Sequence, residues 1–197
     1  MTLSTIPPCD VTLGILAGGR ATRLGGIDKA WLLRGEVPQV LRWQRRFASE
    51  VGKTLVSANR DLPRYAEAAL EAIADRTRGV AGPLAGIDAL LAHCTTPWLL
   101  TLPVDLVGVN ECLLPTLAAG AGAAGAYARD DDGVQPLVAL WRVDEAREPA
   151  RQAIAAGEHS IQQLQQRLPM RAVRFAGVRF GNLNTPDDLI AAGIVAP

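Results

Sequence analysis

The order of apolar and polar positions changes between two periods along the chain. Short runs rich in aliphatic and β-branched residues predict strands at residues 11–16, 53–57, 72–75 and 98–102. Between them, apolar residues recur at helical spacing and predict helices at residues 38–50, 64–71, 84–93 and 111–119. Strands that alternate with helices form a mostly parallel sheet with helices on both faces, so the pattern predicts an α/β fold.

The second half of the chain adds a hairpin and further helices. Residues 125–129 and 137–141 flank the polar segment 130–133, which is typical of a β-hairpin. Helices are expected at 145–156 and 160–167, a strand at 172–175, and a last helix that begins with Thr185 as its cap. We find no linker and no internal repeat, and we expect a single domain over residues 1–197.

Composition narrows the class of protein. With 49% hydrophobic and 20% charged residues, the chain can bury a core, which excludes disorder as its main state. Its zero net charge disfavours a broad nucleic-acid surface. No apolar run reaches the ~18 residues of a membrane span, and no secretory signal is visible, so we expect a cytoplasmic protein without a membrane partner. The charge is uneven, however: Arg20 to Arg46 carry an excess of five positive charges.

Several residue types that often carry chemistry are better explained by packing or solvation. The cysteines have no disulfide or zinc spacing, so we expect free thiols, with Cys94 and Cys112 in or near the core. We expect the histidines His93 and His159 at helix ends or on the surface. We also expect solvated acids at 130–132 and on an exposed helix face at Glu67 and Glu71. The tryptophans should be packing residues; they are Trp31, Trp43, Trp98 and Trp141.

A glycine-rich loop follows the first strand and is the most informative segment. Residues 16–29 read Leu-Ala-Gly-Gly-Arg-Ala-Thr-Arg-Leu-Gly-Gly-Ile-Asp-Lys. Its glycines let backbone N–H groups approach an anion, and Arg20, Arg23 and Lys29 add positive charge, so the loop predicts a polyphosphate ligand. The spacing matches neither the Walker A loop nor the Rossmann dinucleotide motif. The alternative is a flexible surface loop with incidental arginines.

Asp105 is a second candidate on physical grounds. It comes just after an apolar strand, at the edge where open α/β sheets bind their ligands. Mg²⁺ takes one or two carboxylates together with phosphate oxygens and water, so one fixed aspartate opposite a triphosphate is sufficient. No Cys–His or Ser–His arrangement indicates a protein nucleophile.

The loop and five later segments, in the same order, resemble the molybdenum cofactor guanylyltransferases, which attach GMP from GTP to molybdopterin. The later segments are Ser57-Ala58-Asn59-Arg60, Asp75, Gly82-Pro83-Leu84-Ala85-Gly86, Pro103-Val104-Asp105 and Asn182-Leu183-Asn184-Thr185-Pro186. The resemblance implies a Rossmann-like three-layer α/β/α nucleotidyltransferase domain with a mostly parallel sheet and a β-hairpin insertion. Related cytidylyltransferases begin the loop with Ala-Ala-Gly, so Leu-Ala-Gly-Gly favours guanine over cytosine.

The same resemblance implies a role for individual residues. The residues expected to bind GTP are Leu16, Ala17, Gly18, Gly19, Arg20, Lys29, Asn59, Asp75 and Asp105. The catalytic ones are Lys29, Asp105 and Arg23, with Asp105 as the ligand of Mg²⁺, while Asn182 and Asn184 lie near molybdopterin. Without the resemblance, Asn59 could shape a turn, Asp75 could cap a strand end, and Asn184 could help to begin the last helix.

The expected reaction is the transfer of GMP from GTP to molybdopterin, with release of pyrophosphate. Proteins that deliver the cofactor or mature molybdoenzymes are further expected partners. Two alternatives stay open: a nucleotidyltransferase of the same fold that uses CTP or another phosphorylated acceptor, and a GTP-binding maturation factor without catalytic activity.

Overall fold

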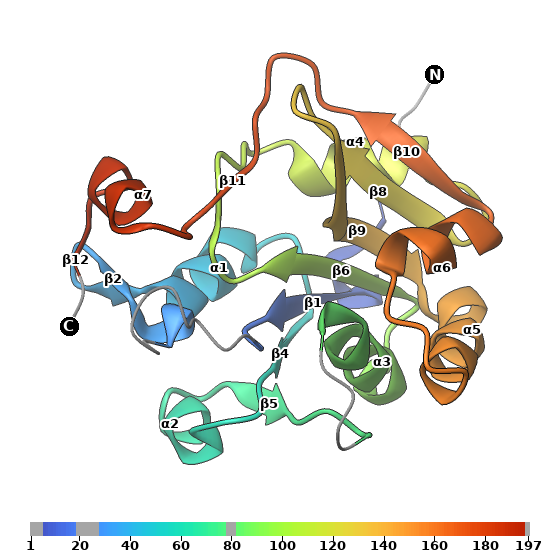
Figure 1. The fold of residues 1–197 in the computed structure, drawn as a ribbon, viewed down its shortest axis with the longest axis horizontal. Coiled ribbons are helices and arrows are strands. Elements are labelled where there is room, and N and C mark those ends of the chain that lie inside the picture. Colours follow the sequence, from blue (N-terminus) through green and yellow to red (C-terminus); the bar gives the residue numbers. More distant parts are fainter. Residues whose placement is uncertain (1–5, 19–27, 78–81, 196–197) are drawn as a thin grey trace.

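The computed structural model describes residues 6–18, 28–77 and 82–195 and is built around a five-stranded sheet with the order β5-β4-β1-β6-β9 (Figure 1). Four of these strands are parallel to one another, and β9 runs antiparallel to β6. Their bounds are β1 (Val11–Leu16), β4 (Lys53–Ser57), β5 (Glu71–Ile73), β6 (Trp98–Pro103) and β9 (Val134–Arg142).

Strand β1 lies in the middle of the sheet, and its six residues are all buried. Leu13 stands opposite Thr54 of β4 and Leu100 of β6. Because successive side chains of a strand point to opposite faces, a strand that is apolar throughout must be covered on both sides. The prediction of a buried first strand is confirmed.

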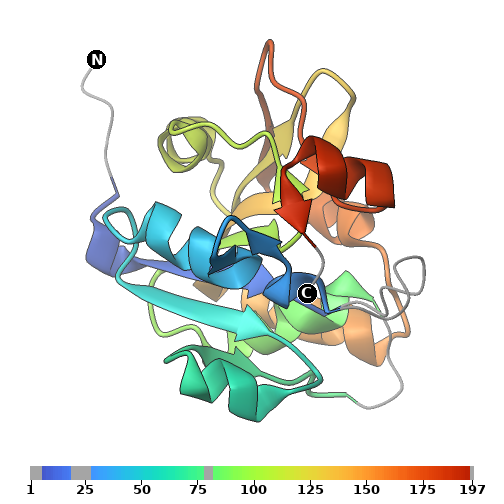
Figure 2. The same ribbon diagram turned by 90° about the vertical axis from the view of Figure 1, so that its left-hand side faces the viewer.

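Helices cover both faces of the sheet and make three layers (Figures 1 and 2). On one face lie α1 (Gln39–Phe47) and α4 (Leu113–Gly120), and on the other lie α3 (Pro83–His93), α5 (Val143–Ala155) and α6 (Ile161–Arg167). The short helix α2 (Leu62–Glu67) precedes the edge strand β5. This arrangement confirms the predicted α/β/α fold class.

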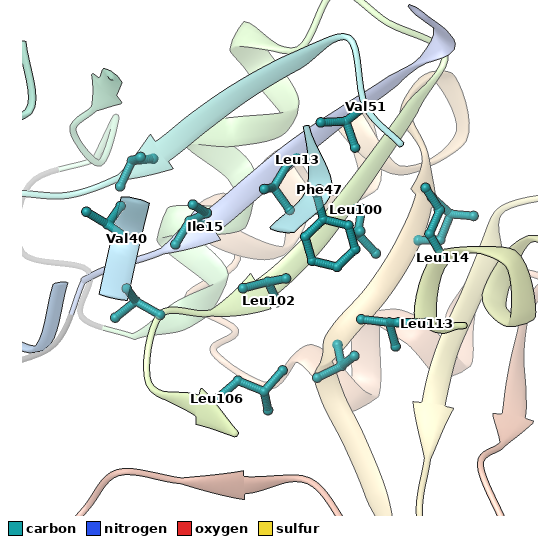
Figure 3. Close-up of a cluster of buried hydrophobic side chains, with 14 of the residues drawn as sticks. Leu13, Ile15, Val40, Phe47, Val51, Leu100, Leu102, Leu106, Leu113 and Leu114 are labelled. Carbon is teal, nitrogen blue, oxygen red and sulfur yellow. The ribbon is translucent and has the colours of Figure 1, made fainter. Parts of the chain in front are cut away.

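The two faces have separate apolar clusters. Figure 3 shows the first, in which Leu13 and Ile15 of β1 meet Phe47 of α1 and Leu113 of α4. On the other face, β1 carries Gly14, where a Cβ would lie 2.9 Å from Leu90 Cδ1. The missing side chain therefore lets α3 pack closely on the sheet.

Beside β9, the strands β8 (Gly125–Arg129) and β10 (Met170–Arg174) form a parallel pair. β8 turns into β9 at the polar segment, where Asp130 N donates to Gly133 O at 2.9 Å, as the hairpin prediction requires. The expectation that all of residues 130–132 are solvated is wrong for Asp130, which is fully buried. Its carboxylate accepts hydrogen bonds from Asp132 N, Gly133 N, the Gln135 amide and Phe180 N.

These hydrogen bonds determine the charge state of Asp130. Burial alone would raise the pKa of this carboxyl group. The hydrogen bonds lower the pKa by more than burial raises it, and the hydrogen bond from Phe180 N has the largest effect among them. Asp130 thus stays ionised and joins the hairpin turn to a segment some 50 residues later in the chain.

Two small sheets near the C-terminus were not predicted. One contains β2 (Leu33–Arg34), β3 (Val37–Pro38) and β12 (Ile194–Val195), and the other pairs β7 (Leu106–Val107) with β11 (Gly181–Asn182). Helix α7 (Pro186–Ala191) lies between β11 and β12 in the chain. A third apolar cluster beneath these elements consists of Leu32, Leu183, Leu189 and Ile194.

Other local predictions fare unequally. The three cysteines are free thiols, and Cys94 is buried, but Cys112 is exposed because it precedes α4, whose buried stripe starts at Leu113. Glu71 is exposed as expected, yet it begins β5 instead of ending a helix.

His93 and His159 are exposed as predicted. All four tryptophans are buried or pack against the core; these are Trp31, Trp43, Trp98 and Trp141.

Two 3₁₀ turns complete the described elements: η1 (Pro8–Asp10) leads into β1, and η3 (Lys29–Trp31) precedes β2. None of the helices within the described ranges has the length and apolar character needed to cross a membrane.

Gly125 is a position where the fold cannot accept a side chain. Its φ is +119°, and a Cβ there would lie 2.0 Å from Leu140 O on β9. We therefore expect Gly125→Ala to lower the free energy of unfolding by about 2–4 kcal/mol, measured by urea denaturation. The control is Gly177→Ala, since Gly177 also has a positive φ but nothing within 4 Å, and it should cost only about 1 kcal/mol. Equal losses in the two variants would contradict the steric explanation.

Candidate active site

The predicted site residues follow the ends of neighbouring parallel strands. Asp75 follows β5, Asn59 follows β4, Gly18 follows β1, and Asp105 follows β6, and these strands are adjacent in this order. Parallel strands have their carboxyl ends at the same edge of a sheet, which is where α/β proteins bind ligands. The structure therefore brings residues from four distant parts of the sequence into one row.

Backbone hydrogen bonds extend the sheet slightly beyond β1. Ala17 N donates to Ser57 O at 2.9 Å, and Val104 N donates to Leu16 O at 3.0 Å. Gly18 comes next and is exposed, and a Cβ on it would lie 4.0 Å from Asn59 Nδ2. The start of the glycine-rich loop thus lies beside Asn59 with its backbone open to a ligand.

Asn59 and Asp75 bind each other in a reciprocal pair. The Asn59 amide donates to Asp75 Oδ2 at 2.8 Å, and Asp75 N donates to Asn59 Oδ1 at 2.9 Å. The pair joins the ends of β4 and β5. An amide has a second N–H, and a carboxylate has further lone pairs, so the pair can still offer both a donor and an acceptor to a ligand.

At the other end of the row, Lys29 lies between Asp105 and Asn184. Lys29 Nζ is 2.6 Å from Asp105 Oδ2 and 3.0 Å from Asn184 Oδ1. The side chains of Lys29 and Asp105 are each 18% exposed, so water screens their attraction less than that of a fully exposed pair. This contact connects the loop, the end of β6 and the C-terminal segment.

The contact with Asn184 depends on the pairing of β7 with β11. Leu183 N donates to Asp105 O at 3.0 Å, and the Leu183 side chain is fully buried. Asn182 lies opposite Leu106 in this pair and is exposed. Within the described residues, Lys29 Nζ donates a hydrogen bond to the side chain of Asn184 and makes none with that of Asn182.

Several residues that the sequence did not indicate support the backbone of Lys29. Asp28 caps η3 by accepting a hydrogen bond from Ala30 N at 2.9 Å, and burial raises the pKa of its carboxyl group. The ring of Trp31 in η3 is 5.0 Å from that of the buried Tyr65, and the Arg64 guanidinium lies 4.2 Å from the Trp31 ring centroid. An Asp just before Lys29 is a capping signal that could have revealed the first of these contacts.

Three predicted site residues lie outside the described ranges: Gly19, Arg20 and Arg23. Their roles therefore stay predictions from the sequence.

A further ion pair lies next to the Asn59–Asp75 pair, at the β5 end of the row. Arg76 follows Asp75 directly, and Arg76 Nη1 lies 3.4 Å from Oδ1 of Asp88 on α3. Asp88 is buried, and burial raises the pKa of its carboxyl group, while the charge of Arg76 acts in the opposite direction. This pair connects the segment after β5 to α3.

Comparison with known proteins gives consistent results. The family model of the MobA-like NTP transferase domain matches residues 13–172. A molybdenum cofactor guanylyltransferase from Serratia proteamaculans is 34% identical over 184 residues, which is 92% of this chain and 93% of the relative. One from Pseudomonas paraeruginosa is 36% identical over 189 residues, which is 93% of this chain and 94% of the relative.

Solved structures share the fold. Molybdopterin-guanine dinucleotide biosynthesis protein A from Archaeoglobus fulgidus has a TM-score of 0.70 at 24% identity and covers 92% of this chain and 96% of its own. The 2-C-methyl-D-erythritol 4-phosphate cytidylyltransferase from Thermus thermophilus has a TM-score of 0.66 at 17% identity, with coverages of 91% and 96%. The predicted nucleotidyltransferase fold is confirmed.

The Arg76–Asp88 pair predicts a pH-dependent stability. Because the native pKa of Asp88 is raised, folding disfavours its ionised form at neutral pH, and Arg76 reduces this penalty. Arg76→Met should lower the free energy of unfolding at pH 7 by about 1 kcal/mol, a small value since the Arg76 side chain is 41% exposed. The loss should shrink between pH 7 and pH 4, because the raised pKa makes Asp88 take up a proton more readily than an unburied carboxyl group, and a protonated Asp88 no longer needs the charge of Arg76.

Urea denaturation at the two pH values measures this effect. In an Asp88→Asn background, Arg76→Met should show no such pH dependence. A loss that is the same at both pH values in the native background would rule out this explanation.

Proposed function

The chain belongs to the family of MobA-like NTP transferase domains, and we propose that it transfers GMP from GTP to molybdopterin as a molybdenum cofactor guanylyltransferase. The observation that carries this proposal is the contact of Lys29 with Asp105 at the carboxyl edge of the sheet. It sets one cation and one carboxylate at the end of β6, next to the central strand β1, as transfer from a nucleoside triphosphate requires. Relatives with this named activity match more than nine-tenths of the chain.

The order of residues along the edge supports one direction for GTP. We place the nucleoside end near Asn59, Asp75 and the backbone of residues 16–18, where exposed polar groups lie beside Gly18. The phosphates then extend toward Lys29. An ammonium group has three N–H donors, and Asp105 and Asn184 accept two of them, so one can be offered to a phosphate oxygen. Gly19, Arg20 and Arg23 are proposed to complete the phosphate site.

The residues present fit a magnesium ion that arrives with the triphosphate. Within the described ranges, no group of three or more His, Cys, Asp or Glu side chains could hold a metal without help. Asp105, however, presents a partly exposed carboxylate at the phosphate end, and Mg²⁺ commonly takes one carboxylate while phosphate oxygens and water complete its shell. When bound, the ion would stabilise negative charge on the phosphates.

The proposed reaction needs no protein nucleophile. An oxygen of the terminal phosphate of molybdopterin forms a bond to the α-phosphorus of GTP, and the bond from that phosphorus to the β-phosphate oxygen breaks. Pyrophosphate leaves with the electron pair, and the product is a dinucleotide. The chain contributes position and charge: Lys29 stabilises negative charge on the α-phosphate, and Asn182 and Asn184 lie on the side proposed for the acceptor.

The nucleotide can be tested directly against the alternatives. We expect pyrophosphate release in the presence of molybdopterin to be at least about a hundredfold faster with GTP than with CTP or UTP, since a site built for one base leaves polar groups unpaired with another. Comparable rates with CTP would overturn the assignment of GTP. GTP binding without pyrophosphate release would instead favour a maturation factor without catalytic activity.

The role of Asp105 gives a second test. Asp105→Asn keeps the size of the side chain but removes the charge that would hold the metal ion, so kcat should fall by at least about a hundredfold while the urea midpoint stays close to that of the native chain. The control is Asp132→Asn, which removes an exposed carboxylate at the hairpin turn and should leave kcat unchanged. Near-native activity of Asp105→Asn would exclude a metal-binding role.

A further inference from the structure

We propose that Asp188, on α7, is a positioning residue that holds Asn184 against Lys29 and thereby fixes the Lys29 ammonium group for transfer. The inference rests on the proposed function and adds one residue to it. Within the described ranges, Asp188 makes no hydrogen bond of its own with Lys29, Asp105 or the glycine-rich loop.

Asp188 does more than a helix cap requires. In a capping box, the N-cap side chain accepts from the backbone of the third helical residue, whose side chain accepts in return from the N-cap backbone. Thr185 and Asp188 form such a box: Asp188 N donates to Thr185 Oγ1 at 3.2 Å, and Thr185 N donates to Asp188 Oδ2 at 2.7 Å. The same carboxylate oxygen also accepts from Asn184 N at 2.9 Å, one residue before the helix.

This additional hydrogen bond fixes the residue that contacts Lys29. On one side of Asn184, Leu183 N is bound to Asp105 O and its side chain is buried. On the other side, Asn184 N is bound to Asp188. The backbone is thus held on both sides of Asn184, and the oxygen of its side-chain amide lies 3.0 Å from Lys29 Nζ.

The charge of Asp188 is consistent with its hydrogen bond to Asn184. The hydrogen bond with the Thr185 side chain lowers the pKa of Asp188 most. The hydrogen bonds from the backbone N–H groups of Asn184 and Thr185 and the charge of Lys29 act in the same direction. Asp188 therefore stays ionised at neutral pH, and its negative charge acts on the ammonium group that it helps to position.

The fold of α7 does not depend on this carboxylate alone. Leu189 of α7 belongs to the buried cluster with Leu32, Leu183 and Ile194, which anchors the helix to the segment after Lys29. Loss of the cap should therefore leave α7 in place. An effect on Lys29 can then be distinguished from a loss of structure.

The kinetic test compares the two halves of the capping box. Asp188→Ala should lower kcat for pyrophosphate release about tenfold, as expected when a hydrogen bond that positions a charged group is lost, and change KM for GTP by less than about threefold. Thr185→Ala removes the other side-chain cap but keeps both backbone N–H groups, and its kcat should stay within about twofold of native. Asp188→Asn retains an acceptor oxygen and should restore part of the activity.

A double-mutant cycle tests whether Asp188 acts through Asn184. In an Asn184→Ala background, Asp188→Ala should cause less than about a twofold further loss of kcat. A full tenfold loss in that background, or a kcat of Thr185→Ala as low as that of Asp188→Ala, would overturn the inference.

A chemical readout separates this inference from the proposed function. The chain has two lysines, Lys29 and Lys53, and Lys53 lies in the separate ion pair with Glu71. Acetic anhydride labelling, followed by peptide mass spectrometry, should modify Lys29 at least about threefold faster in Asp188→Ala and in Asn184→Ala than in the native chain or Thr185→Ala, because a less ordered ammonium is more accessible. Lys53 should react equally in all four proteins.

The two failures are distinguishable because labelling needs no substrate. If the native chain transfers no GMP but the labelling differs as expected, the proposed function fails and Asp188 still positions Lys29. If the native chain is active but Lys29 reacts equally in all four proteins, the positioning role is wrong.

Discussion

The central position of β1 is the constraint on which the rest of the structure depends. β1 is buried on both faces and paired on both edges, with β4 on one side and β6 on the other. Since all three strands are parallel, their carboxyl ends must lie side by side. Residues placed directly after these strands therefore meet at one edge, although Gly18, Asn59 and Asp105 are far apart in the sequence.

The C-terminal segment completes the edge through a second, weaker constraint. β7 and β11 are two residues long, and such short strands are not stable alone. Their pairing is supported by Leu183, which is buried with Leu32 in the third apolar cluster. Because Leu32 follows Lys29 closely and Leu183 precedes Asn184, this packing brings the asparagine to the lysine. The apolar contact thus determines a polar one.

Sequence reasoning succeeded where a pattern is local and failed where the cause lies elsewhere in the chain. β1 was predictable because six consecutive residues fit a fully buried strand, and Asp105 was predictable because it follows such a strand. Asp130, in contrast, lies in a run of three aspartates that is typical of a solvated turn. The cost of burying its charge is offset by the hydrogen bond from Phe180 N, a partner that no local pattern indicates. The strands β2, β3 and β12 have too few residues for any periodicity. Arg20 and Arg23 stay sequence predictions because the described ranges do not include them.

The partners of Lys29 explain how the site that we propose for a triphosphate can contain a carboxylate. An unpaired carboxylate near a triphosphate would repel it, but Lys29 balances the charge of Asp105 at 2.6 Å and keeps one donor for the ligand. Asp28 and the contact of Trp31 with Tyr65 fix the backbone around this lysine, and Asn184 holds its ammonium group. A charge that is already oriented needs little reorganisation when negative charge develops on the α-phosphate. In the proposed reaction the rate therefore depends on how firmly the Lys29 side chain is held, and residues without contact to the ligand can affect it.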